Sequence, residues 1–115
     1  PDSAGGRMTT EFVSASEAIT VEEALVAVRA MARTERREAL YAVYTTDHAG
    51  RLTGVLSLRE LLAAPEGARL AEVAWSEVVT VQVDAAQEEV ARIASNYDLV
   101  AVPVVDVENR LVGVV

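Results

Sequence analysis

The chain has 115 residues, 51% of them hydrophobic, which suits one compact domain with a substantial core. It contains no cysteine, so a disulfide scaffold, a thiolate metal site and a cysteine nucleophile are excluded, and a reducing compartment is the default. The net charge of −8 disfavours nucleic acid and anionic membranes as partners, and the apolar runs fall short of the ~20 residues that a membrane helix needs.

The first half of the chain predicts a strand, a helix, a hairpin and a short helix. After a Gly-containing lead-in at residues 1–7, a short strand is expected at residues 8–13. Thr20 and Glu23 fit a capping box, in which each side chain accepts an amide hydrogen that the helix start leaves unpaired. Apolar residues at helical spacing then predict an amphipathic helix, ending or extending in solvent at the charged residues 33–38. The hairpin strands and the short helix are expected at residues 40–46, 52–56 and 58–63.

The second half predicts the same order of elements after a break. The break is Ala-Pro-Glu-Gly at residues 64–67. Pro103 cannot donate to a ladder, so we expect it at a sheet edge or at the start of a strand. The expected elements are a strand at 78–83, a helix at 87–97 and strands at 99–105 and 111–115.

The two halves also repeat each other in sequence. Residues 47–56 return 59 positions later as residues 106–115, each copy an acidic residue and a turn followed by Arg-Leu-x-Gly-Val. The repeat predicts an α/β (α+β) fold of two β-α-β-β-α units that cover each other. We expect residues 1–63 to hold the lead-in and first unit, 64–71 the linker, and 72–115 the second unit. The second unit is expected to be truncated, because it stops where the first continues into its last helix.

The acidity is concentrated in the second unit. Residues 1–71 carry ten acids and eight Arg, whereas residues 72–115 carry eight acids and two Arg. Such a surface attracts cations, although solubility alone is the plainer explanation.

The segments Pro-Val-Val-Asp at residues 103–106 and Asn-Arg-Leu-Val-Gly-Val-Val at 109–115 resemble the cystathionine-β-synthase (CBS) motif. The resemblance implies a tandem CBS pair (Bateman module), whose two units are related by a pseudo-twofold axis and enclose two clefts. Further segments are similar to the CBS pair of MgtE-type magnesium transporters, so that the resemblance covers essentially the whole chain. These segments are residues 4–13, 54–61, 84–92 and 96–99.

The resemblance implies a regulatory function and no enzymatic one. Such a chain would be a cytoplasmic domain of an inner or plasma membrane protein, forming a homodimer below the pore without itself entering the membrane. Mg²⁺ would bridge its carboxylates, compact it against an N-terminal domain and close the pore through a connecting helix. One alternative is an adenine-nucleotide-sensing CBS module that regulates another enzyme or transporter; another is a purely structural dimerisation module.

Glu88 and Asp98 align with positions that line magnesium sites in the family. Ten residues of helix span about 15 Å, so these two carboxylates cannot hold one ion together and each needs partners elsewhere. Without a metal, Glu88 would be a first-turn carboxylate favoured by the helix dipole, and Asp98 a residue of the turn that ends the helix.

Ser57 and Glu60 raise the question of ATP or another adenine nucleotide. In many CBS pairs, Ser or Thr followed three residues later by Asp binds nucleotide through phosphate and ribose. Here the acid is Glu, and the same residues also fit a capping box that needs no ligand. Arg59 would meet a phosphate and Leu99 would line the adenine slot.

No constellation for catalysis is visible. The sequence lacks a nucleophile–base pair, a Gly-rich phosphate loop and a His-rich metal site, so we expect no enzymatic activity. His48 is expected to be a solvent-exposed turn residue.

Overall fold

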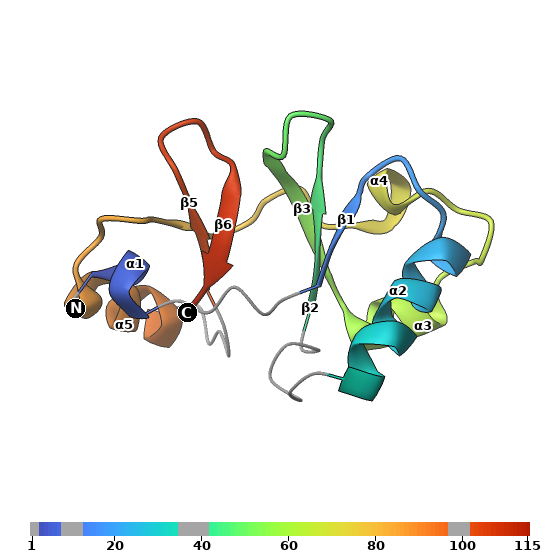
Figure 1. Ribbon diagram of the computed structural model, residues 1–115, viewed down its shortest axis with the longest axis horizontal. Coiled ribbons are helices and arrows are strands. Elements are labelled where there is room, and N and C mark those ends of the chain that lie inside the picture. Colours follow the sequence, from blue (N-terminus) through green and yellow to red (C-terminus); the bar gives the residue numbers. More distant parts are fainter. Residues whose placement is uncertain (1–2, 8–12, 35–41, 97–101) are drawn as a thin grey trace.

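Two three-stranded sheets with the same topology stand side by side, with the larger helices at the two outer ends (Figure 1). The computed structural model describes residues 3–7, 13–34, 42–96 and 102–115. In each sheet the first pair of strands is parallel and the second antiparallel, which confirms the repeat and the α/β fold. The sheets are formed by β1 (Val13–Ser16), β2 (Ala42–Thr46) and β3 (Leu52–Ser57), and by β4 (Val81–Gln82), β5 (Pro103–Val105) and β6 (Leu111–Val114).

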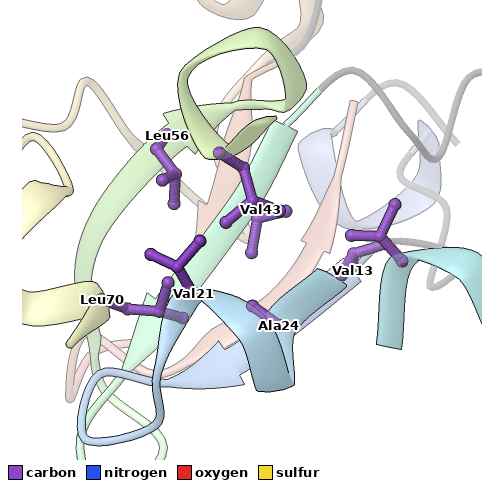
Figure 2. Packing of buried hydrophobic residues seen from close by; sticks show 8 residues of the cluster. Val13, Val21, Ala24, Val43, Leu56 and Leu70 are labelled. Atoms are coloured by element: carbon purple, nitrogen blue, oxygen red, sulfur yellow. The ribbon is translucent and has the colours of Figure 1, made fainter. Parts of the chain in front are cut away.

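The first sheet is covered by α2 (Val21–Thr34) and α3 (Leu58–Ala63). Thr20 and Glu23 make the predicted capping box: the Glu23 amide donates to Thr20 Oγ1 at 3.2 Å, and the Thr20 amide to Glu23 Oε1 at 3.0 Å. Burial of one stripe of α2 against the sheet accounts for its amphipathic pattern. Figure 2 shows this core, which includes Val13, Val21, Ala24, Val43, Leu56 and Leu70.

The second core includes a segment from the opposite end of the chain. Its buried residues from the second unit are Val81, Val90, Val102 and Val104, with α5 (Gln87–Asn96) as the covering helix. The lead-in forms a one-turn helix, α1 (Ala4–Arg7), that packs here beside α5 (Figure 1). Its amides pair with the second unit, since those of residues 4 and 5 donate to the carbonyls of residues 85 and 83, each at 2.7 Å.

A third core joins the two sheets. Tyr44 and Leu52 of the first unit pack with Val105 and Val114 of the second, and burial raises the pKa of Tyr44 to about 12. The hairpins are joined by two bonds that the repeat makes equivalent: residue 52 donates to the carbonyl of 109 at 2.9 Å, and residue 111 to that of 50 at 3.2 Å. This exchange confirms the pseudo-twofold relation between the units.

Several element boundaries differ from the predicted ones. The strand expected at 8–13 is found as β1, which begins at Val13; residues 8–12 lie outside the described part. The segment expected to link the units contains a further helix, α4 (Leu70–Val73), because Leu70 is fully buried and its amide donates to the Ile19 carbonyl at 2.9 Å. Such a contact joins distant parts of the chain and leaves no local pattern.

The strands of the second unit are shorter than those of the first. The strand expected at 78–83 is found only as Val81–Gln82. In the parallel register of β4 and β5, Thr80 would lie opposite Pro103, and Pro103 has no amide hydrogen to donate to β4. Of the two places predicted for Pro103, a sheet edge or a strand start, the structure has the strand start: β5 begins there rather than at residue 99, and it is the middle strand of its sheet. The helix expected at 87–97 is α5, while Tyr97 and residues 99–101 lie outside the described part. No helix among the described residues is long and apolar enough to cross a membrane.

Candidate functional site

Ser57 and Glu60 lie at the junction of β3 and α3, where the predicted capping box is present. Ser57 is the N-cap residue of α3, and its Oγ accepts a hydrogen bond from the Glu60 amide at 3.0 Å. In return, Glu60 Oε1 accepts from the Ser57 amide at 2.8 Å. The predicted capping box is therefore confirmed, and both side chains stabilise the start of α3 without a ligand.

The second oxygen of Glu60 is bound to a distant residue. The indole Nε1 of Trp75 donates to Glu60 Oε2 at 3.0 Å. The backbone of Trp75 exchanges two hydrogen bonds with Val55 of β3, which brings the indole to Glu60, while the residue as a whole remains 64% exposed. The Ser57 amide lowers the pKa of Glu60 most; burial opposes it, and the indole and the Ser57 side chain add to the lowering, so the net shift is downward. The carboxylate is thus fixed and ionised at neutral pH.

Three of the four residues considered for nucleotide binding share this junction. Arg59 is exposed beside Ser57 and Glu60, whereas Leu99 lies outside the described residues. Each Glu60 oxygen has a second lone pair, so the carboxylate can accept a further bond without losing its present ones. The sequence pattern did not reveal Trp75 as a partner, because the contact depends on pairing between β3 and a segment beyond α4.

Glu88 lies exposed in the first turn of α5, where the helix dipole favours a carboxylate. Asp98 lies outside the described residues. Within the described ranges, no group of three or more His, Asp or Glu side chains is placed to hold a metal ion. Mg²⁺ takes one or two protein carboxylates and keeps several waters, and Glu88 is a single exposed carboxylate.

The two hairpin turns share the same aspartate–arginine pair. In the first turn, Asp47 Oδ1 accepts from the amides of Ala49 and Arg51, and its Oδ2 accepts from Arg51 Nε at 2.9 Å. Asp106 and Arg110 repeat these contacts in the second turn, with an Nε–Oδ2 distance of 3.0 Å. His48 is exposed in the first turn, as predicted.

The hydrogen bonds in these turns keep both aspartates ionised. Burial opposes ionisation of Asp47, but the Arg51 and Ala49 amides outweigh it and hold the pKa of this carboxyl below its ordinary value. The pKa of Asp106 is lowered chiefly by the Arg110 amide. Each aspartate therefore holds its arginine in a fixed orientation at the end of a hairpin.

Comparisons with known proteins match nearly the whole length of this chain. The family model of the CBS domain matches residues 4–67 and 70–115. The magnesium transporter MgtE of Thermus thermophilus is 49% identical over 114 residues, which are 99% of this chain and 25% of that protein. MgtE of Enterococcus faecalis is 38% identical with the same coverage. The chain thus spans about a quarter of the length of these relatives.

Solved structures give the same result. The crystal structure of the cytosolic domain of the Mg²⁺ channel MgtE in complex with ATP has a TM-score of 0.92 and 48% identity, covering 99% of this chain and 45% of that one. The soluble part of a magnesium transporter has a TM-score of 0.92 and 37% identity, covering 99% and 44%. The tandem arrangement of the two units is therefore shared with both.

Proposed function

The chain belongs to the CBS-domain family, and we propose that it is the cytosolic magnesium-sensing module of a magnesium transporter or channel. The observation that carries this proposal is the 49% identity to an MgtE transporter over nearly the whole chain. The fold supports a regulatory rather than a catalytic role, since CBS pairs serve as control modules. The location on the cytoplasmic side of a membrane follows from the same relationship.

The mechanism is cation-dependent compaction. The net charge of −8 means that neighbouring copies and domains repel one another when Mg²⁺ is scarce. Mg²⁺ bound between carboxylates offsets this repulsion, and the compact arrangement closes the pore. Glu88 supplies one such carboxylate from an exposed helix start, and Asp98 is assigned the same role by resemblance. The remaining ligands come from a second copy, an N-terminal domain or a connecting helix.

The test is magnesium gating in the full-length transporter. Replacing Glu88 or Asp98 with Ala should move the Mg²⁺ concentration for closure upward, on the order of tenfold if a direct or water-mediated ligand is lost. The measurement is flux into liposomes as a function of Mg²⁺ on the cytosolic face. Glu89→Ala is the matched control, because Glu89 is also exposed in the first turn of α5. Unchanged gating in both variants would remove the assignment of these residues.

Adenine-nucleotide sensing is the second candidate function. It is supported by the grouping of Ser57, Arg59 and Glu60 at the start of α3 and by a similar MgtE cytosolic domain that was crystallised with ATP. In this function Arg59 meets a phosphate, Glu60 accepts from a ribose hydroxyl, and Leu99 lines the adenine.

Calorimetric titration with ATP and AMP, with and without Mg²⁺, separates the two functions. Arg59→Ala should weaken nucleotide binding, whereas Arg29→Ala, an exposed arginine on α2, should not. Nucleotide binding without any effect of Mg²⁺ would favour a nucleotide sensor over a magnesium sensor. A stable dimer that responds to neither would favour a purely structural module.

A further inference from the structure

A surface hollow of ≈ 450 Å³ lies between the turns of the two hairpins, and it is distinct from the sites discussed above. Its lining residues are Ala49, Arg51, Glu108 and Arg110. Ala49 and Arg51 are the repeat equivalents of Glu108 and Arg110, so the hollow straddles the pseudo-twofold axis. The backbones of Arg51 and Arg110 pair with each other as an isolated bridge, which places the two guanidinium groups on one small surface.

Both arginines are held in position before any ligand arrives. Each directs its Nε to an aspartate at 2.9–3.0 Å, and that aspartate is itself fixed by two backbone amides. Both side chains remain half exposed, at 52% for Arg51 and 50% for Arg110. The Nε bond thus anchors each guanidinium, and its terminal nitrogens are not needed for that bond.

The two turns differ in the partners of their arginines. In the second turn, Arg110 Nη2 pairs with Glu108 Oε2 at 2.9 Å. In the first turn the equivalent of Glu108 is Ala49, which has no carboxylate. The terminal nitrogens of Arg51 make no hydrogen bond to any residue in the described part of the chain. One acceptor position that is filled at Arg110 is thus open at Arg51.

We propose that this hollow binds a small phosphate-type oxyanion, which takes at Arg51 the place that Glu108 takes at Arg110. The planar guanidinium fork matches a phosphate through two parallel N–H donors, and with Nε engaged the edge formed by the two terminal nitrogens is the one available. The hollow has the volume of a small-molecule site. Arg51 precedes β3 whereas Ser57 ends it, so this site is separate from the candidate nucleotide site.

The charges around the hollow set the strength of binding. Asp47 and Asp106 are ionised and each is paired with its arginine, and Glu108 is paired with Arg110. Glu108 nevertheless repels an anion and the site is open to water, so the expected dissociation constant lies in the millimolar range.

The experiment is a titration with inorganic phosphate, without Mg²⁺ or nucleotide and at constant ionic strength. Binding is followed by the ¹H–¹⁵N signals of the arginine Nε groups in the intact chain. We expect a saturable shift that is largest at Arg51 and smaller at Arg110. Arg51→Gln removes the first signal and should abolish the phosphate-dependent shift of Arg110, whereas Arg29→Gln on α2 should leave both shifts unchanged. Because Mg²⁺ and nucleotide are absent, the outcome is independent of the proposed sensing function.

Two further variants use the internal symmetry as a control. Ala49→Glu copies the second turn into the first, so it should fill the open position and abolish phosphate binding while the thermal stability stays at or above that of the parent chain. Glu108→Gln frees the second arginine and removes a negative charge, so it should tighten binding by up to about tenfold. The proposal is overturned if phosphate gives no saturable shift, if Ala49→Glu still binds, or if Arg29 responds as strongly as Arg51.

Discussion

At the scale of single residues, Glu60 connects the start of α3 to the segment that follows α4. One oxygen completes the capping box with Ser57, and the other accepts the indole hydrogen of Trp75. The capping box could be predicted because its partners are three residues apart. The bond to Trp75 could not, because it needs the backbone pairing between Val55 and Trp75.

The charge of Glu60 should stabilise the fold in a pH-dependent way. Its pKa in the folded chain is lowered, so its contribution is present above the ordinary pKa of a glutamate and is lost as the pH falls through the folded-state value. Glu60→Gln keeps a capping oxygen but presents an amide to the indole donor. We expect this variant to lose about 1 kcal/mol of unfolding free energy at neutral pH, as for loss of a cap or hydrogen bond.

The check is urea denaturation followed by circular dichroism at neutral pH and at a series of lower pH values. The difference between Glu60→Gln and the parent chain should shrink as the parent carboxyl becomes protonated. Arg59→Gln, which changes a neighbouring exposed charge, serves as the control. An equal loss at all pH values would show that the ionised carboxylate is not the cause.

At the scale of the elements, the segment around Trp75 passes close to the backbone of β3 at Gly54. A Cβ atom built there would lie 2.8 Å from Thr45 Oγ1, 2.9 Å from the Trp75 carbonyl oxygen and 3.1 Å from Ala74 Cβ. The glycine therefore lets the segment around Trp75 pair with β3. Both copies of the repeat contain a glycine at this place in the hairpin, but the close contact that requires it at Gly54 is visible only in the tertiary structure.

Gly54→Ala should destabilise the chain by about 1–3 kcal/mol, the usual cost of overpacking a tight contact with backbone that cannot give way. Gly67→Ala is the matched control, because nothing lies within 4 Å of its added methyl group. That variant should be neutral or more stable by about 0.5 kcal/mol, since alanine restricts the unfolded chain. Thermal denaturation of the two variants tests the difference. Equal melting temperatures would contradict the close approach.

At the scale of the whole molecule, the two units are joined at Asn109 as well as through the shared core. Asn109 has a positive φ of 64°, the equivalent of Gly50 with 83°, and its Nδ2 donates to the Leu52 carbonyl at 3.1 Å. Asparagine is one of the few residues that tolerate this conformation, and here its side chain also ties the second hairpin to the first.

Asn109→Ala should lower the unfolding free energy by about 1–3 kcal/mol, because it strains the left-handed turn and removes the bond to Leu52. Asn109→Gly relieves the strain, so it should lose about 1 kcal/mol through the missing bond and the freer unfolded chain. His48→Ala, in the exposed turn of the other hairpin, should change little. Urea denaturation measures all three; equal losses for Ala and Gly would argue against a role for the backbone conformation.

The sequence by itself determined the repeat, the order of the strands and of α2, α3 and α5, and the two capping boxes. These features rest on contacts within a few residues or on the periodic burial of side chains, both of which leave local patterns. The tertiary structure alone decided that α1 packs on the second unit, that Leu70 and Trp75 return to the first, and that Arg51 and Arg110 share one hollow. Each of these depends on how the two copies face each other, and a pattern within either copy carries no information about that relation.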